Sequence, residues 1–82
     1  MQSFRAVVTV RLKDSILDPA GEATEGVLKH MGFAVQGVRI GRHIQVTLEA
    51  EDAKAARRAV ERMAHDLLAN PVMEDYDVEV LS

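Results

Sequence analysis

Apolar and polar residues alternate from Phe4 to Leu12, so that every second side chain in this stretch is apolar. A period of two with several β-branched residues is typical of a strand that buries one face. Val7 is the exception, because it is an apolar residue on the otherwise polar face. The pattern therefore predicts a first strand whose second face is also covered somewhere near Val7.

Three later stretches show a similar alternation. The first two, residues 33–40 and 43–49, are separated only by Gly41 and Arg42, and so short a connection favours an antiparallel hairpin. In the last stretch, residues 76–81, apolar side chains alternate with acidic ones before the final leucine. We therefore predict three more strands.

Two segments between these strands have helical spacing. Asp18 is a preferred N-cap and Pro19 suits the first helical position, so a helix is expected from Pro19 to a stop at Gly32. The second helix begins at Glu51 and ends before Pro71, because the residue before a proline is pushed out of the α region. Its apolar stripe is the clearest in the chain and consists of Ala53, Ala56, Val60, Met63 and Leu67.

The order β-α-β-β-α-β predicts one α+β domain over residues 1–82. Two helices on one face of an antiparallel sheet give a two-layer sandwich of ferredoxin-like type. The sequence leaves the strand order open, and the last strand could pair with another subunit. An oligomer with strand pairing between copies is therefore compatible with the pattern.

Length and composition narrow the possible functions. A chain of 82 residues buries only about 60% of the surface that its unfolded form exposes, and association of subunits is one way to support so small a core. Cysteine is absent, which excludes disulfides, thiolate metal sites and a thiol nucleophile. No apolar run approaches the roughly 18 residues of a membrane span, and no signal peptide is apparent. We expect a cytoplasmic protein.

The net charge of −3 is unevenly distributed. Residues 1–42 hold six basic and four acidic residues, or +2, whereas residues 43–82 hold four basic and nine acidic residues, or −5. An acidic chain with two phenylalanines, one tyrosine and no tryptophan lacks the cations and stacking aromatics of a nucleic-acid binder. The uneven charge suits contact with protein partners of complementary sign.

The sequence contains no convincing catalytic or metal-binding constellation. No two of the three histidines share a helix at a spacing of four, no serine lies in a Gly-x-Ser-x-Gly elbow, and no glycine-rich phosphate loop is present. The nearest approach to an anion site is the turn at Gly41, where Arg39 and Arg42 could hold a phosphate or a partner carboxylate. Contact with a protein is the more credible role. The residues describe a small non-catalytic module, without a cofactor or metal of its own, that oligomerises.

Three stretches together resemble the PurS family: residues 17–23, residues 38–44, and residues 67–76, which contain the run Leu-Ala-Asn-Pro-Val-Met-Glu-Asp-Tyr. The resemblance covers essentially the whole chain, and the third stretch is its most specific part. Ser15, Ala20 and Arg42 depart from the glycine, glutamine and lysine that are common in the family at these positions. The first two departures affect the expected shape of the first loop.

This resemblance implies the small, non-catalytic subunit of phosphoribosylformylglycinamidine synthase in purine biosynthesis. It implies a glutaminase subunit and a large synthetase subunit as partners, with ATP and magnesium used by the synthetase. The small subunit would bridge the two and assist ammonia transfer between them. It would work as a homodimer or homotetramer.

We therefore expect the functional residues to be interface residues. The turn would present Arg39, Gly41 and Arg42 to a partner, although two solvated arginines on a hairpin would look the same in the sequence. Two proline loops are weaker candidates, because helix capping explains Asp18 and Pro19 and helix termination explains Asn70 and Pro71. Candidate oligomer contacts on the second face of the sheet are Val7 and Leu81.

Other modules share the same order of elements. A regulatory domain that binds a small metabolite would carry a glycine-rich loop after the first strand, and residues 13–17 have no glycine. A heavy-metal carrier needs a cysteine pair, and an RNA-binding module needs exposed aromatics on its central strands. The metabolite-binding module is the main alternative to the synthase subunit.

Overall fold

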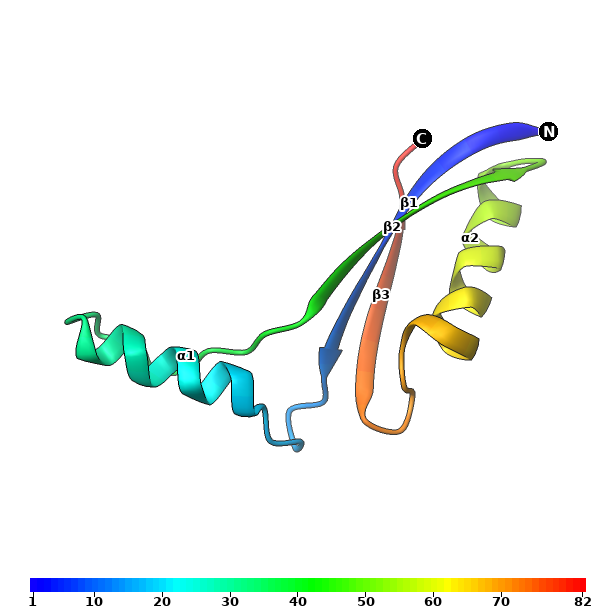
Figure 1. Ribbon diagram of the computed structural model, residues 1–82. Coiled ribbons are helices and arrows are strands. Elements are labelled where there is room, and N and C mark those ends of the chain that lie inside the picture. The colour runs from blue at the N-terminus through cyan, green and yellow to red at the C-terminus, as the bar shows by residue number, and fades with distance from the viewer.

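Three antiparallel strands form the sheet of the computed structural model, which describes residues 1–82 (Figure 1). Strand β1 (Gln2–Leu12) lies in the centre, between β2 (Arg42–Ala50) and β3 (Glu74–Val80). Helix α1 (Pro19–His30) connects β1 to β2, and helix α2 (Ala53–Met63) connects β2 to β3. The α+β class and the antiparallel sheet are confirmed.

Strand β1 is paired on both sides, by β2 and β3, and its alternating apolar residues meet apolar residues of both strands. Val8 stands opposite Ile44 on β2 and Val78 on β3, so three apolar side chains share one row of the inner face. Val8 and Val10 are completely buried on that face, and burying a valine stabilises a fold by about 1.5 kcal/mol or more. The predicted first strand is therefore correct.

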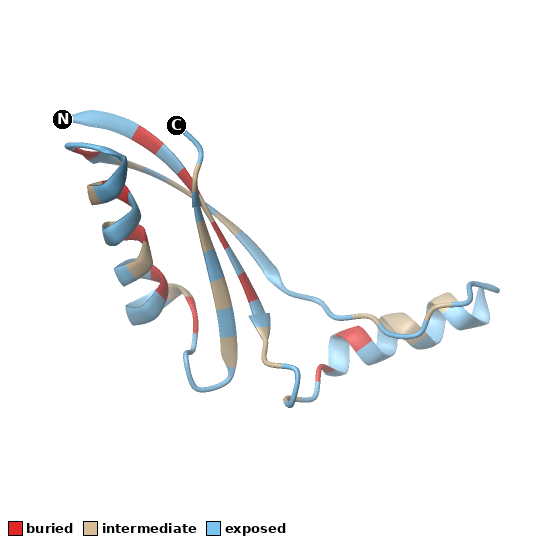
Figure 2. Ribbon diagram, turned by 180° about the vertical axis from the view of Figure 1, so that it is seen from behind, coloured by how far each residue is buried: buried red, intermediate tan, exposed pale blue.

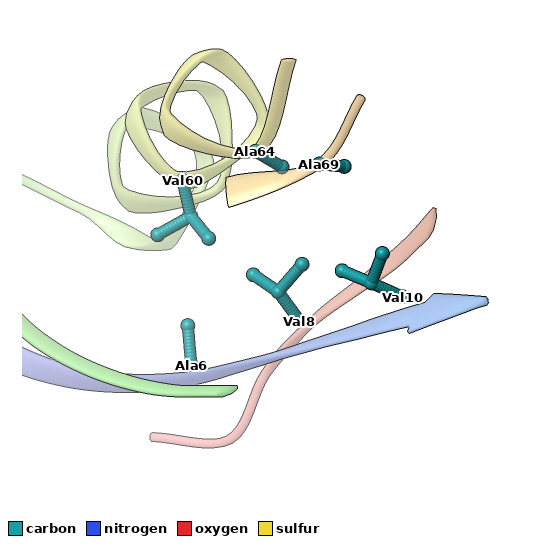
Figure 3. Packing of buried hydrophobic residues seen from close by; sticks show 6 residues of the cluster. All are labelled: Ala6, Val8, Val10, Val60, Ala64 and Ala69. Carbon is teal, nitrogen blue, oxygen red and sulfur yellow. The ribbon is translucent and has the colours of Figure 1, made fainter. Parts of the chain in front are cut away.

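Helix α2 covers the inner face of the sheet. Figure 3 shows Val60 and Ala64 on one side of the core, facing Ala6 and Val8 on the other. Several of the buried side chains are alanines, which allows the helix backbone to lie close to the strands. Asp52 caps this helix by accepting a hydrogen bond from the Ala55 N–H at 2.7 Å.

The last turn of this helical segment widens into a π-helix, η1 (Ala64–Leu68). Its defining bond runs from the Ala69 N–H to the Ala64 carbonyl at 2.9 Å, five residues back. Ala64 and Ala69 thus both enter the core, while Leu67 is 82% exposed. The prediction that Met63 and Leu67 continue the buried stripe is wrong, because the stripe follows Ala56, Val60 and Ala64 instead.

The predicted strand at residues 33–40 does not form, and no hairpin closes at Gly41. Figure 1 shows the chain after α1 running back beside the helix and then straight into β2, so the connection just before β2 does not reverse the chain direction. A strand needs an edge to pair with, and a segment collinear with β2 cannot fold back on β2. The sheet of one chain therefore has three strands where the sequence pattern predicted four.

Helix α1 projects away from the sheet, as Figures 1 and 2 both show. The prediction of two helices on one face is wrong for a single chain, because only α2 covers the sheet. The start predicted at Asp18-Pro19 is correct, and Gly32 stops the helix with a positive φ of 100°. The molecule is elongated, with extents of 52 × 25 × 14 Å. Its outer helix keeps exposed apolar residues that nothing in the chain covers, namely Val27 and Met31, followed by Phe33.

Candidate partner interface

The end of the sheet where β1 finishes brings three separate segments together. We call residues 12–19, 38–42 and 70–75 the loop cluster. Lys13 links two of them, because its backbone N–H donates to the Met73 carbonyl at 2.9 Å. Arg39 links the third to the first by a hydrogen bond to the Lys13 carbonyl, also at 2.9 Å. All candidate interface residues except Val7 and Leu81 lie in this cluster.

Asp18 does more in the cluster than cap α1. Its side chain is only 4% exposed, and one carboxylate oxygen accepts the Gly21 N–H at 2.9 Å, which is the capping bond. The other oxygen accepts the N–H of Ile40 at 2.8 Å. Ile40 belongs to the segment that connects the end of α1 to β2. These two bonds, that of Ile40 first, lower the pKa of the Asp18 carboxyl. Charge-assisted bonds of this kind are stronger than neutral ones.

The guanidinium of Arg39 points to its own chain. Its Nη2 atom donates to the carbonyls of Lys13 at 2.9 Å and Ile16 at 3.0 Å, with a longer contact of 3.5 Å to Leu12. These carbonyls belong to the loop between β1 and α1, so Arg39 holds that loop closed. A contact of Arg39 with a partner stays a prediction, but its observed bonds are all internal.

Two glycines permit the backbone to approach closely in the cluster. A Cβ atom on Gly21 would collide with the Val38 carbonyl, and one on Gly41 would collide with the Val10 carbonyl. Pro19, the first residue of α1, has no backbone N–H to leave unpaired. Gly26, in the same helix, has open space around its Cβ position, so the close approach in α1 is confined to Gly21.

Arg42 and Asn70 hold the turn that precedes β3. The Arg42 guanidinium bonds both carboxylate oxygens of Glu74, at 2.9 and 3.1 Å. Glu74 also accepts the Asn70 N–H at 2.7 Å, and the Asn70 side chain accepts the N–H of Val72 at 3.1 Å, beyond Pro71. Asn70 is therefore a turn residue as well as the end of the helical segment.

Exposed apolar side chains surround this rigid base. Val72 is 80% exposed in the turn held by Asn70, and Leu17, Ile40 and Met73 are exposed in the neighbouring segments. Rigid loops with apolar side chains and a polar rim are what protein–protein contacts use. None of these four residues was predicted from the sequence as an interface residue. The sequence could have indicated them only by their position beside the turn residues, within the three stretches that resemble the PurS family.

Val7 and Leu81 lie together on the face of the sheet that α2 leaves open. Both line one shallow hollow, with Arg5, Gln45 and Thr47 around it. Leu81 is held there by backbone bonds between β1 and the end of the chain, its N–H donating to the Arg5 carbonyl at 2.8 Å. The structure thus brings the two predicted oligomer contacts into one surface, while the contact itself stays a prediction.

Most ionisable groups in the cluster are bonded to other groups of the same chain. His, Asp and Glu nowhere gather in a group of three that could hold a metal ion. Lys13 pairs with Asp75 at 2.8 Å, and this bond lowers the pKa of the Asp75 carboxyl. Asp18, Arg39, Arg42 and Glu74 are likewise engaged in bonds within the chain.

Residues 5–82 match the family model of PurS, described as phosphoribosylformylglycinamidine (FGAM) synthase. The chain belongs to the PurS family. It is 42% identical over 78 residues to the PurS subunit of this synthase from Bacillus subtilis, covering 94% of this chain and 92% of the relative. It is 35% identical over 82 residues to the subunit from Thermotoga maritima, covering 99% of this chain and 100% of the relative.

The fold agrees with that of PurS proteins of known structure. PurS in the structure of PurLQS from Thermotoga maritima superposes with a TM-score of 0.91 at 35% identity, covering 99% of this chain and 100% of that one. PurS from Methanocaldococcus jannaschii, described as one of the subunits of formylglycinamide ribonucleotide amidotransferase in the purine biosynthetic pathway, gives 0.85 at 32% identity, with 96% of each chain covered. Neither helix of this PurS-family chain is long and apolar enough to cross a membrane.

Proposed function

We propose that this PurS-family subunit of phosphoribosylformylglycinamidine synthase works in purine biosynthesis by joining other subunits, without a catalytic group of its own. The reaction is the ATP-dependent conversion of formylglycinamide ribonucleotide and glutamine to formylglycinamidine ribonucleotide and glutamate. In this proposal a glutaminase subunit releases ammonia from glutamine. A large synthetase subunit activates the formyl amide with ATP and magnesium.

The single observation that carries the proposal is the loop cluster. Most of its ionisable side chains fix its own three segments, as the bonds of Asp18, Arg39 and Glu74 show. Among the side chains that the cluster presents to solvent is a group of large apolar ones, of which Val72 is the most exposed. A surface whose charged groups are engaged within the chain and whose apolar groups are exposed is suited to binding a protein.

A bridging subunit would also assist the transfer of ammonia between the two active sites. Ammonia is protonated in water at neutral pH, and ammonium is no longer a nucleophile. A complex that passes ammonia between two active sites therefore benefits from contacts that exclude water along the route. A small subunit seated between the two larger ones would supply such contacts. The chain itself would need no cofactor, and the complex would work in the cytoplasm.

We further propose a homodimer in which two copies complete each other's sandwich. Helix α1 has an uncovered apolar side that includes Val27 and Met31, and the inner face of β2 is only half buried at Ile44, Val46 and Leu48. Placing α1 of one copy on this part of the other copy's sheet would bury both. The extended residues 33–40 would then lie beside the partner's sheet and supply the strand that one chain lacks.

This arrangement would also explain why the sequence predicts a β-α-β-β-α-β sandwich that the single chain does not form. The four predicted strands and two helices would all be present around each sheet, but one strand and one helix would come from the second copy. The open face around Val7 and Leu81 would remain free, and two dimers could meet there as a homotetramer.

The decisive experiment measures synthase activity with the glutaminase and synthetase subunits of the same organism, with and without this chain. We expect glutamine-dependent turnover to require the chain and ammonia-dependent turnover to be independent of it. Equal glutamine-dependent turnover in its absence would rule out the bridging role. Loss of ammonia-dependent turnover as well would point to a direct effect on the synthetase active site.

A further inference from the structure

The two connections of helix α1 are tied to each other by side chains that cross in opposite directions. From the connection that enters the helix, the Asp18 carboxylate reaches the backbone N–H of Ile40 at 2.8 Å. From the connection that leaves the helix, the Arg39 guanidinium reaches the backbone carbonyls of Lys13 and Ile16 at 2.9 and 3.0 Å. Each bond joins residues that are at least 22 positions apart.

This crossed pair lies at the base of an arm that consists of α1 and the segment that returns beside it to β2. The helix itself projects from the sheet, and its outer part contacts neither the strands nor α2 (Figures 1 and 2). Gly21, in the first turn of α1, is its only buried residue, and it lies against the Val38 carbonyl of the returning connection. Since neither α1 nor the segment that returns beside it packs on the sheet along its length, the direction of this arm relative to the sheet is set at its base.

We propose that Asp18 and Arg39 are positioning residues that hold α1 in the direction in which a second copy accepts it. This inference rests on the exchange of α1 between two copies proposed above. An arm that is already oriented loses less conformational freedom on association than one that swings on two flexible connections, so the crossed bonds strengthen the dimer without touching the partner. The effect arises in the free chain, because the bonds restrict the movement of α1 before a second copy binds.

Asp18→Asn separates the two functions of Asp18 with almost no change in volume. Asparagine caps helices about as well as aspartate, so the bond to the Gly21 N–H can be kept. The amide group that replaces the second oxygen then faces the Ile40 N–H with hydrogens of its own, and that bond is lost. Asp52→Asn is the matched control, because the Asp52 side chain caps α2 by accepting the Ala55 N–H and makes no other hydrogen bond.

Arg39→Met tests the other half of the pair. It keeps a long apolar stem and removes the guanidinium donor to the Lys13 and Ile16 carbonyls. Arg39→Lys restores a charged donor with three hydrogens and should recover part of the effect. Arg58→Met is the matched control for loss of charge, because Arg58 is exposed on α2 and makes no hydrogen bond or ion pair within the chain.

The experiment measures the dimer dissociation constant of the full chain by sedimentation, together with amide hydrogen exchange. We expect Asp18→Asn and Arg39→Met each to raise the dissociation constant about tenfold, as loss of one well-formed bond allows, while both controls leave it unchanged. Exchange at the Ile40 amide should speed up in Asp18→Asn, and the β1 amides should stay as protected as in the wild type.

Unchanged dissociation constants in both variants would overturn the inference. So would loss of protection throughout β1, because Asp18 and Arg39 would then support the whole fold and not the direction of one helix. A monomeric wild-type chain would overturn the exchange of α1 and this inference with it. The bridging role would still be judged separately by the glutamine-dependent assay.

Discussion

Arg42 and Glu74 reach across the end of the central strand to join the first residue of β2 to the first residue of β3. One guanidinium nitrogen, Nη2, contacts both carboxylate oxygens, at 2.9 and 3.1 Å, and Glu74 also accepts the Asn70 N–H. The Arg42 side chain is half exposed and that of Glu74 mostly buried. This bridge therefore links the stability of the sheet to the shape of the turn that carries Val72.

Reversing one charge of this bridge should loosen the turn while the chain stays folded. Arg42→Glu places two carboxylates together, and a surface ion pair of this kind is worth about 0 to 1 kcal/mol. We expect the midpoint of thermal unfolding to fall by at most about 8 °C, and binding of the partner subunits to weaken. The swap Arg42→Glu with Glu74→Arg should restore both properties. A swap that restores stability but not binding would mean that Arg42 itself contacts a partner.

Two glycines in the same helix should respond in opposite ways to alanine. Gly26 has open space around its Cβ position, so Gly26→Ala should raise the free energy of unfolding by about 0.5 to 1 kcal/mol through the better helix propensity of alanine. Gly21→Ala should lower it, because the new methyl group collides with the Val38 carbonyl. Urea unfolding of the two variants measures the difference. Equal stabilisation by both would show that residues 38–40 do not lie against the helix.

The base of α1 should be sensitive to acid only at low pH. Hydrogen bonds from Ile40 and Gly21 lower the pKa of the Asp18 carboxyl, so the folded chain holds this proton less tightly than the unfolded chain. The resulting stability is fully present above the unfolded-state pKa of about 3.9 and is lost as the pH falls through the lower folded-state value.

An NMR titration of the Asp18 carboxyl group and of the Ile40 amide provides the measurement for this behaviour. Both signals should move with one midpoint, and that midpoint should lie below the ordinary value for aspartate. In Asp18→Asn the shift of the Ile40 amide over this range should disappear. A midpoint above the ordinary value would contradict the observed hydrogen bonds.

Val72→Glu should impair binding of the partner subunits without changing the fold. The side chain is 80% exposed, so a charge there costs the free chain little, but it would be buried against an apolar partner surface. We expect glutamine-dependent activity to fall at least tenfold at limiting subunit concentration, with an unchanged melting temperature. Lys54→Glu, an exposed change on α2, serves as the comparison. Normal activity of Val72→Glu would exclude this turn from the interface.

Val7→Glu tests the open face of the sheet. Val7 lines the hollow with Leu81, so a charge there should break any oligomer that buries this surface. A wild-type tetramer should become a dimer, because the proposed exchange of α1 uses other residues. Light scattering distinguishes the two masses. An unchanged tetramer would place the contact elsewhere, and conversion to monomers would mean that the open face forms the primary dimer.

Local patterns predicted the elements that local interactions determine. The alternation of β1, the cap at Asp18 and the stop at Gly32 each depend on neighbours within a few residues, and all three are correct. Of the stripe predicted for α2, Ala56 and Val60 are buried, whereas Ala53 is exposed. Beyond Val60 the π-helical turn changes the period, and Leu67 turns outward.

Long-range relationships could not be read from these patterns. The alternation in residues 33–40 shows that the segment can form a strand, but not whether an edge is available to pair with it. The bond of Asp18 to Ile40 and the bonds of Arg39 to the preceding loop join residues far apart in the sequence. The family resemblance located the segments that contain them, whereas only the structure shows that each side chain bonds to the backbone of the other segment.

The projecting helix makes the integrity of this subunit a matter of concentration. If part of its apolar surface is buried only when two chains meet, then mass action governs how much of the finished structure exists, and dilution acts on the subunit as a mild denaturant would. The amount of chain that a cell makes then influences more than the number of complexes. It also sets the fraction of chains whose sandwich is complete and able to receive the larger subunits.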